Sequence, residues 1–532
     1  MNCAVSDRAR PRPTTKRTLT MNRIRQAALA LLALAAASAG AQVINESVIY
    51  AVNPPVFNTY FGSAIAANDS IVVIGARGAS GPGQGSVGIY DRQTGAFIRN
   101  LIPTNGANIT NFGAQVAIEG NIIIVSNTIY RSFLEVQRGV YVFDATTGTQ
   151  LYELTSNFPI PEQASYGVSI DIDNNVIAVG SPLENLGSGS VYLYNAATGA
   201  LLNQVFGDEV GPSPIFELFG SSVDLSNGKL AVGSGNPSFA GDCIGCPHDA
   251  YLFDVATGQR LNKISPPINA GEEFTFAEAV AINADTLVVT APGDDPFGPN
   301  SGSVFTYDIN TGALRDTLPI TNQSGGGVPP MFVKISDTGI IAVAAPNQSG
   351  VDLFDAATGT LLSTLIPVNP GPSFSPAALA MDTNSIFVGE PTFNDAGETF
   401  AGIAYRFDTS LQITAQPQSQ AVNFNADDVS FSVAAINVAT YQWSLNGLDI
   451  TDGPLFSGTD TNFLIVTPDA ATEGTYQVTL TGNEFGIVQS DPAVLAILGN
   501  AAPDCLVDLN EDGTLNFFDI SLFLQLFSAG CP

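Results

Sequence analysis

The sequence predicts an all-β protein: a seven-bladed β-propeller, followed by a smaller β-sandwich and a short C-terminal loop-and-helix module. Three observations lead to this prediction. A sequence motif recurs about every fifty residues: an aromatic residue, Asp or Asn, a short turn and Thr-Gly. Repetition at this period is typical of propellers and solenoids. Glycine (52 residues) and proline (33 residues) are abundant, which favours many turns over long helices.

The chain contains six complete copies of this motif and one truncated copy. The truncated copy, Phe407-Asp408, lacks both the Thr-Gly turn and the strand that should follow it. The complete copies begin at Tyr90, Phe143, Tyr194, Phe253, Tyr307 and Phe354.

Each repeat is expected to supply four strands. An alternating strand opens it, as in residues 61–66, and a continuous apolar strand follows, as in residues 71–75. Alternation indicates a half-buried strand, whereas a short apolar run indicates a strand buried on both faces. A Gly-Ser-Val-aromatic strand and an outer strand such as residues 361–365 complete the unit. Four strands per repeat are the blade of a propeller.

The missing outer strand of the last repeat has a substitute near the N-terminus. Residues 47–54 are similar to residues 362–370, which form the outer strand of the preceding repeat. We therefore expect the N-terminal strand to pair with the last blade, which closes the ring and removes its open edges.

Residues 1–41 are predicted to be a signal peptide, with Met21 as the true start. Arg23 and Arg25 precede an apolar core at residues 27–37, and Ala-Gly-Ala at residues 39–41 is a small-residue cleavage site. About eleven apolar residues are too few to span a bilayer. We expect a bacterial protein that is secreted or held at the cell surface, with no transmembrane segment in the mature chain.

The charge of the chain excludes one class of partner. The predicted signal peptide holds seven Lys/Arg and one acidic residue, which leaves 11 bases against 48 acids. Such an excess of negative charge repels nucleic acid and favours solubility and cation binding. An acidic surface that keeps an exported protein soluble accounts for the same composition.

The repeats resemble those of a known family. The Phe-Gly opening, the Gly-Ala-Pro-like strand ends such as Gly180-Ser181-Pro182 and the Gly-Ser-Val-aromatic strands resemble FG-GAP repeats, over residues 42–410. That family forms the propeller of integrin α chains and of many bacterial surface proteins, so the resemblance implies the fold and leaves the ligand open. Asp294-Asp295 and Asn300 lie where integrin-type blades often bind calcium, but without that spacing, and a solvated turn is expected.

Residues 411–498 resemble an immunoglobulin-like domain. Alternating strands surround Trp443, a hairpin turn is expected at Asn446-Gly447, and Tyr476 occupies the place of the tyrosine corner. Val478, with Phe431 or Val433, stands where the family has its two cysteines, so apolar packing must replace the disulfide.

The last segment, residues 499–532, contains the clearest chemical motif. Oxygen-bearing groups follow the spacing of an EF-hand calcium loop, with Gly513 at the sharp turn. The expected Ca²⁺ ligands are Asp508, Asn510, Asp512, the carbonyl of Thr514, Asn516 and Asp519.

Asp519 at the last position of the loop resembles a dockerin module, but only one of the usual two loops is present. The apolar helix after the loop presents hydrophobic residues on nearly every side, which implies a protein partner, either cohesin-like or an envelope component. Cys505 and Cys531 bracket the loop and helix and are candidates for a disulfide.

Cys243 and Cys246 lie in a predicted blade loop and leave three alternatives. They form a local disulfide, a redox pair or half of a zinc site, the last disfavoured because the chain has neither a second such pair nor two histidines. The single histidine, His248, is expected to be a polar loop residue.

Three functions are consistent with these features. The leading hypothesis is a non-catalytic binding or adhesion protein, attached through a Ca²⁺-dependent tail, with a glycan or protein ligand on the propeller. The second is an extracellular carbohydrate-active enzyme, for which a carboxylate pair would be needed. The third is a structural envelope protein. A Ser-His-Asp triad is disfavoured because the chain has only one histidine.

Overall fold

The computed structural model describes most of residues 42–498, and beyond them only Ser521 and Leu524. Its gaps of four or more residues are 51–58, 79–84, 105–108, 128–138, 157–164, 209–216, 236–247, 268–275, 295–301, 321–330, 346–349, 368–373, 395–398 and 483–486. The predicted signal peptide (1–41), the calcium-loop residues 508–519 and all four cysteines of the predicted mature chain lie outside the described residues.

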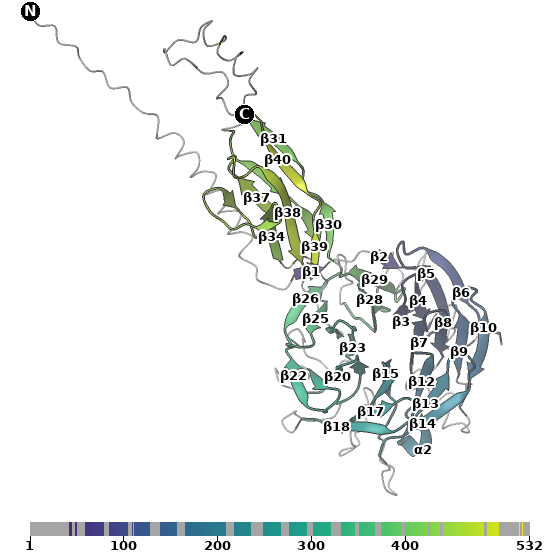
Figure 1. Cartoon of the computed structure of the whole chain (residues 1–532). Helices are drawn as coiled ribbons and strands as arrows, with labels where there is room; N and C mark the ends of the chain where they lie inside the picture. The colour runs from purple at the N-terminus through teal and green to yellow at the C-terminus, as the bar shows by residue number, and fades with distance from the viewer. Residues whose placement is uncertain are drawn as a thin grey trace, which may run out of the picture. The chain divides into compact units, whose positions relative to one another are not determined.

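The described part is all-β, as predicted, and its dominant feature is a repeated antiparallel sheet (Figure 1). Seven such sheets occur in the described residues, each built on four strands. The first strands are β3 (Phe61–Ala67), β7 (Gln115–Glu119), β11 (Ser169–Asp173), β15 (Ser222–Ser226), β19 (Val280–Ile282), β23 (Phe332–Ile335) and β27 (Ala378–Met381). The second strands are β4 (Ile71–Ala76), β8 (Ile122–Ser126), β12 (Val176–Ser181), β16 (Lys229–Gly233), β20 (Thr286–Ala291), β24 (Ile340–Ala344) and β28 (Ser385–Glu390).

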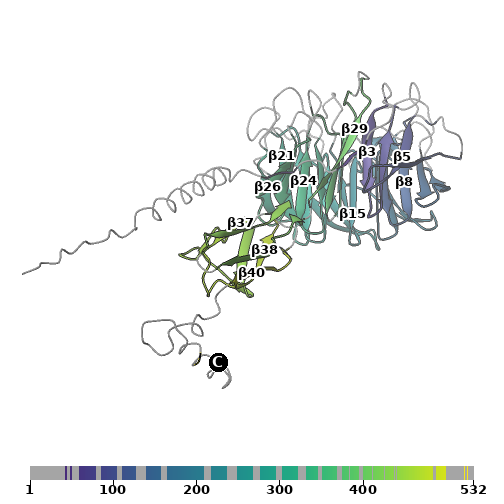
Figure 2. The ribbon, with the colours of Figure 1, turned by 90° about the horizontal axis from the view of Figure 1, so that it is seen from above.

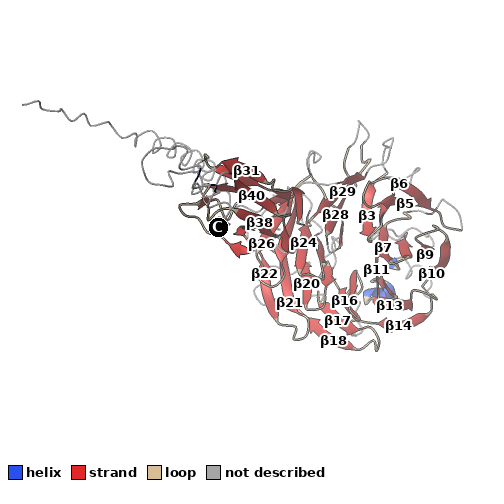
Figure 3. Cartoon of the chain, turned by 45° about the horizontal axis from the view of Figure 1, so that its top comes forward, coloured by secondary structure: helices blue, strands red, loops and turns tan. Residues whose placement is uncertain are grey.

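The third and fourth strands complete each sheet. The third strands are β5 (Ser86–Asp91), β9 (Val140–Asp144), β13 (Ser190–Asn195), β17 (Ala250–Asp254), β21 (Ser303–Asp308), β25 (Val351–Asp355) and β29 (Ile403–Asp408). The fourth strands are β6 (Phe97–Leu101), β10 (Gln150–Leu154), β14 (Leu201–Val205), β18 (Arg260–Ile264), β22 (Leu314–Leu318), β26 (Leu361–Leu365) and, for the last sheet, β2 (Val48–Tyr50). A short strand, β1 (Gln42–Ile44), precedes β2, and one helix, α2 (Glu184–Gly187), lies between β12 and β13 (Figure 3).

The seven sheets form a closed ring. The first strand of each sheet contacts the first strand of the next, and β27 of the last sheet contacts β3 of the first. The first strands therefore line the centre of a propeller-like ring, and the sheets stand side by side around it (Figure 2). The second and third strands are the most deeply buried, because their side chains fill the space between neighbouring sheets. The fourth strands form the outer rim and are largely exposed.

The predicted closure by the N-terminal strand is confirmed. β2 pairs antiparallel with β29, with Tyr50 opposite Ala404. The Tyr50 side chain is fully buried, donates a hydrogen bond to the Arg92 carbonyl (2.9 Å) and meets the Tyr90 ring edge-on. Arg92 in turn forms an ion pair with Asp382 of the last sheet (2.7 Å). One strand and one ion pair thus join the two ends of the ring.

The repeated aromatic-Asp…Thr-Gly motif forms the turn between the third and fourth strands of each sheet. In the fourth sheet, Asp254 Oδ1 accepts hydrogen bonds from the Thr257 N–H (2.8 Å) and the Thr257 hydroxyl (2.6 Å). Gly258 follows with a φ of 68°, a conformation that favours glycine. These hydrogen bonds, first from the Thr257 side chain, lower the pKa of Asp254. The third sheet uses Asn195 at the same place with the same two bonds, so the turn requires an oxygen acceptor and not a charge.

The Phe-Gly step differs from the prediction in one respect. In the second repeat it precedes the strand, since residues 111–114 form a turn and β7 begins only at Gln115. Gly113 has a φ of 87°, and it lies against Gly75 of the preceding sheet so closely that a Cβ on Gly75 would overlap the Gly113 carbonyl oxygen. The glycines of this step therefore allow neighbouring sheets to approach.

The strands after residue 411 form a separate β-sandwich. One sheet contains β31 (Gln420–Asn423), β40 (Ala493–Leu498), β38 (Gly474–Thr481), β34 (Thr440–Leu445) and β35 (Leu448–Asp449), with β39 (Ile487–Gln489) also on β38. The other contains β32 (Val429–Ser432), β37 (Phe463–Val466) and β36 (Phe456–Ser457), and β30 (Gln412–Ala415) pairs with β33 (Ala434–Ile436).

The sandwich has the core that the sequence predicts. Phe431, Trp443, Tyr476 and Val478 are buried in one cluster, and the Tyr476 hydroxyl donates to the Thr472 carbonyl (2.6 Å). The expected hairpin turn is confirmed, because Leu445 pairs with Leu448 and both residues between them have positive φ.

The closure of the ring predicts a graded response at Tyr50. Tyr50→Ala removes a fully buried ring and should lower the free energy of unfolding by about 3–5 kcal/mol. Tyr50→Phe removes only the hydrogen bond to Arg92 and should cost about 1 kcal/mol. Deletion of residues 42–58 should destabilise more than either. Urea unfolding followed by fluorescence measures the series, and equal stability of all four proteins would contradict the closure.

The repeated turn predicts a difference between two substitutions at one position. Asp254→Ala removes the acceptor of the Thr257 bonds and should lower the melting temperature. Asp254→Asn keeps an acceptor, as Asn195 does, and should stay near the wild type. Because the pKa of Asp254 is lowered, any advantage of the wild type over Asp254→Asn is present at neutral pH and is lost as the pH falls through that pKa. Calorimetric scans at pH 7 and pH 3 test both statements.

Candidate functional site

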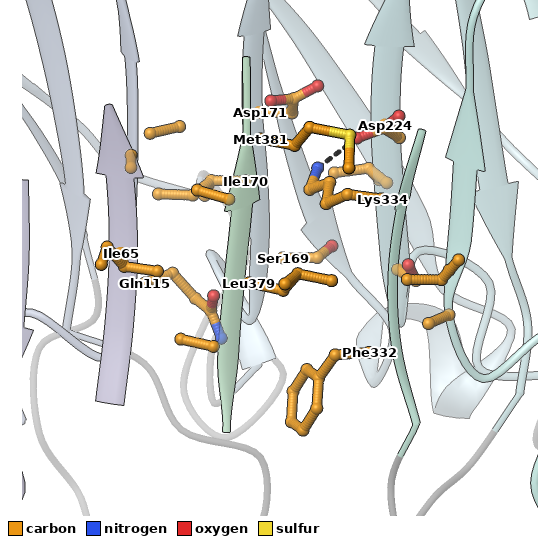
Figure 4. A pocket seen from close by; sticks show the side chains of 18 of the residues that line it. Ile65, Gln115, Ser169, Ile170, Asp171, Asp224, Phe332, Lys334, Leu379 and Met381 are labelled. Atoms are coloured by element: carbon orange, nitrogen blue, oxygen red, sulfur yellow. Dashed lines mark hydrogen bonds and ion pairs between the residues drawn. The ribbon is translucent and has the colours of Figure 1, made fainter. Parts of the chain in front are cut away.

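The centre of the ring is a cavity of about 560 Å³. Its walls are the first strands of all seven sheets, so each wall position occurs once per repeat. A volume of this size is typical of small-molecule sites, which are concave and mostly apolar with a few polar groups. Ile65, Ile170 and Leu379 supply hydrocarbon along the middle of the wall (Figure 4).

Three charged side chains occupy one position of the repeat. Asp171 and Asp224 stand on β11 and β15, and Lys334 stands on β23. The Lys334 ammonium donates to Asp224 Oδ1 (2.5 Å), across the sheet that lies between them (Figure 4). In four other sheets the same position holds Ala66, Ala117, Ala281 and Ala380. The scaffold is therefore repetitive, but its charge is confined to three sheets.

Each of the two aspartates also holds the neighbouring strand. Asp171 Oδ2 accepts from the Leu225 N–H (2.6 Å), and Asp224 Oδ2 accepts from the Ile282 N–H (2.9 Å). The first strand of each sheet is an edge strand, and its N–H groups need acceptors from outside its own sheet. Ser222 does the same with its hydroxyl, which accepts from the Val280 N–H (3.1 Å).

The charges of this group shift the pKa values of Asp171 and Lys334. Burial raises the pKa of Asp171 to about 7, and the Asp224 carboxylate adds to the shift while Lys334 opposes it. Burial opposes the charge on Lys334, but the carboxylates of Asp224 and Asp171 outweigh it and raise its pKa. The ammonium therefore stays charged, and Asp171 is poised to gain or lose a proton near neutral pH.

Glu278 is a fourth group in the cavity wall, in the residues that lead into β19. Its side chain is 8% exposed, and its Oε2 atom has no hydrogen-bond partner among the described residues. Burial raises the pKa of Glu278 to about 8, so the carboxyl is protonated at neutral pH.

Other buried carboxylates are held by hydroxyl groups near the ends of the third strands. Glu184 accepts from Ser156 (2.9 Å), Ser190 (2.5 Å) and Tyr192 (2.8 Å). Glu390 accepts from the Tyr405 hydroxyl (3.2 Å), and burial raises its pKa to about 7. These carboxylates are satisfied within the fold and serve as anchors for the loops.

The sequence-predicted sites have different outcomes. The calcium ligands Asp508, Asn510, Asp512, Thr514, Asn516 and Asp519, and the cysteines Cys243, Cys246, Cys505 and Cys531, lie outside the described residues. His248 is half-buried beside the buried Asp249. Within the described residues, no group of three or more His, Cys, Asp or Glu side chains is placed to hold a metal ion.

The expectation of a solvated turn at Asp294 is wrong. Asp294 is buried and accepts a hydrogen bond from the Ser303 hydroxyl (2.5 Å), while its carbonyl accepts from the Gly302 N–H (2.8 Å). The carboxylate fastens the start of β21 to the end of β20, so it acts inside the sheet. Asp295 and Asn300 lie outside the described residues.

The sequence analysis missed Asp171, Asp224, Glu278 and Lys334. One sign was present for two of them: aligning the repeats on the Phe-Gly or Tyr-Gly step places Asp171 and Asp224 in the column that contains Ala66 and Ala117. The sixth repeat lacks this step, so the alignment does not find Lys334. A charge at a position that the repeat keeps small is a departure from the scaffold, and departures of this kind indicate sites.

Comparison with known proteins finds a family match to one repeat and a weak likeness to a solved propeller. A family model for the FG-GAP repeat matches residues 268–307, so the resemblance is confirmed in the fifth repeat. Among solved structures the chain is similar to the β-propeller domain of the Trilobed protease from Pyrococcus furiosus, with 12% identity and a TM-score of 0.40 over 63% of this chain and 91% of that one. No curated protein matches in sequence. No helix in the described residues is long and apolar enough to cross a membrane.

The raised pKa of Glu278 predicts that replacing its carboxyl stabilises the protein at high pH. A carboxyl whose pKa is raised in the folded state stabilises fully below the unfolded pKa of about 4.3, and this stability is lost as the pH rises towards about 8. Glu278→Gln removes the ionisable group and should raise the free energy of unfolding by roughly 2–4 kcal/mol at pH 9, with little change at pH 4.5. Urea unfolding at the two pH values measures this difference.

The exposed Glu473 provides the control, since Glu473→Gln should change stability little at either pH. An equal effect of Glu278→Gln at both pH values would show that its carboxyl ionises normally.

Proposed function

We propose that this chain is a secreted or cell-surface, non-catalytic binding and adhesion protein. Its first part is a seven-bladed FG-GAP propeller that carries the ligand, and its second part is an immunoglobulin-like spacer. A Ca²⁺-binding tail then attaches the molecule to a protein partner. The bound ligand is a glycan or a protein.

The observation that carries this proposal is the closed ring of repeated sheets, together with the FG-GAP match in one repeat. A ring closed by β2 gives a rigid platform, because the strand that starts the ring also completes its last sheet. FG-GAP propellers act as binding modules, and the central cavity offers a concave surface with a few charged groups.

The sandwich supports the spacer role. A buried Trp443 and a Tyr476 hydroxyl bonded to the backbone four residues earlier are features of immunoglobulin-like domains. Apolar packing of Phe431 and Val478 around the tryptophan takes the place of a disulfide. Residues 411–498 contain no cysteine, so this module has no disulfide of its own.

The tail is proposed to provide the attachment. Residues 508–519 have the oxygen spacing of a calcium loop, and the apolar helix predicted after them would need a partner to cover it. The partner is cohesin-like or another component of the cell envelope. A high net negative charge across the chain also favours cation binding.

Calcium titration of the full mature chain, residues 42–532, tests the attachment. We expect one saturable binding event by calorimetry, and Ca²⁺-dependent binding to the isolated envelope fraction that EDTA reverses. The double variant Asp508→Asn with Asp512→Asn should lose both, because two charged ligands are removed. Asp460→Asn, an exposed carboxylate in the sandwich, should lose neither. Envelope binding that is unchanged in EDTA and in the double variant would contradict the proposal.

A further inference from the structure

The cavity at the centre of the ring is lined by more acidic than basic residues. Its described lining contains six acidic residues and one basic residue, Lys334. The acidic residues are Asp171, Asp173, Asp224, Glu278, Asp337 and Asp382. Low-dielectric walls strengthen the field of such a group.

We propose that this cavity binds an organic cation, an ammonium group carried on an apolar body, with the ammonium beside Asp171 and the body along the hydrocarbon wall. The inference rests on the proposed function, because it names the chemistry of a ligand that the propeller part would take.

Asp171 forms no ion pair within the described residues, although Lys334 lies near enough to oppose the rise in its pKa. The one ion pair that Lys334 makes within the described residues is with Asp224, which leaves Asp171 with hydrogen-bond donors only. Two carboxylates and one ammonium therefore face the cavity at this level (Figure 4). A second ammonium group would balance the charge and stabilise the ionised form of Asp171, whose pKa burial raises.

Support of the neighbouring strand does not explain why this residue is charged. Asp171 accepts the Leu225 N–H, but Ser222 gives the next strand the same kind of support with a neutral hydroxyl. Amide side chains also connect neighbouring sheets, as Asn283 does by donating to the Ser336 carbonyl (2.9 Å). A half-buried carboxylate costs more to desolvate than either neutral group, so support of the neighbouring strand alone does not account for the charge of Asp171.

Glu278 gives an independent indication of a missing ligand. Its side chain is more than nine-tenths buried in the same wall, and its Oε2 atom has no hydrogen-bond partner among the described residues. Buried polar groups in folded proteins are almost always paired. A cationic or N–H-bearing ligand in the cavity would supply the partner and lower the pKa of Glu278.

The wall favours an organic cation over a metal ion. Calcium and magnesium need about six oxygen ligands in a tight shell. Within the described residues no group of three or more His, Cys, Asp or Glu side chains is placed to hold a metal ion, and Lys334 already occupies Asp224. The volume of about 560 Å³ accommodates an alkyl or aromatic amine rather than a bare ion.

Titration of the full mature chain with n-hexylammonium, and with 1-hexanol as the matched neutral probe, tests the proposal. The buffer contains saturating Ca²⁺, so that the tail contributes no heat. We expect the ammonium to bind at least fivefold more tightly than the alcohol. Asp171→Asn should remove this preference, while Asp460→Asn, which removes an exposed charge elsewhere, should keep it within twofold.

A second variant covers the case in which Asp171→Asn does not fold. Lys334→Met removes the competing ammonium from Asp224 and should tighten hexylammonium binding at least threefold. Equal binding of amine and alcohol, or unchanged amine binding in whichever variant folds, would overturn the proposal. Binding of Mg²⁺ with the same dependence on Asp171, and no amine binding, would also overturn it. Any of these failures leaves Ca²⁺-dependent envelope attachment intact, so the two proposals fail separately.

Discussion

The ring depends on how the edges of its seven innermost strands are satisfied. Each of these strands pairs with its own sheet on one side only, so its other edge faces the next sheet and the central cavity. Side chains from the neighbouring sheet supply the missing partners. Asp171 accepts the N–H group of Leu225, and Asp224 accepts that of Ile282. These bonds connect the sheets where hydrophobic packing is thinnest.

The same constraint explains the composition of the seam between the last and first sheets. There the two ends of the ring meet, and an ion pair between Arg92 and Asp382 adds to the side-chain-to-backbone bonds, such as the one from Arg406 to the Arg92 carbonyl (2.5 Å). Arg92 also donates to the Ser385 hydroxyl, and its carbonyl accepts from Tyr50 of the N-terminal strand. The closing strand and the closing ion pair therefore meet at one residue, Arg92, through its carbonyl and its side chain.

Local patterns made most of the fold predictable. The Thr-Gly turn involves residues that are three or four apart, such as Asp254 and Thr257, so its chemistry is visible in the sequence. The hairpin at Asn446-Gly447 and the outer strand at residues 361–365 are equally local. The burial of Asp294 was not predictable in this way, because its partner Ser303 follows a loop whose length hides the contact.

The charged group in the cavity shows why a site is harder to predict than its scaffold. Asp224 and Lys334 are 110 residues apart and meet only because the ring places sheets four and six on either side of sheet five. In a perfectly repeated ring, every sheet would carry the same residue at this position, and like charges would repel around the axis. Alanine in four sheets and opposite charges in the other three avoid that repulsion. As a result, these charged groups lie on one side of the cavity. Breaking the repeat at a single column is thus sufficient to convert a symmetric scaffold into a site that distinguishes one charge from the other.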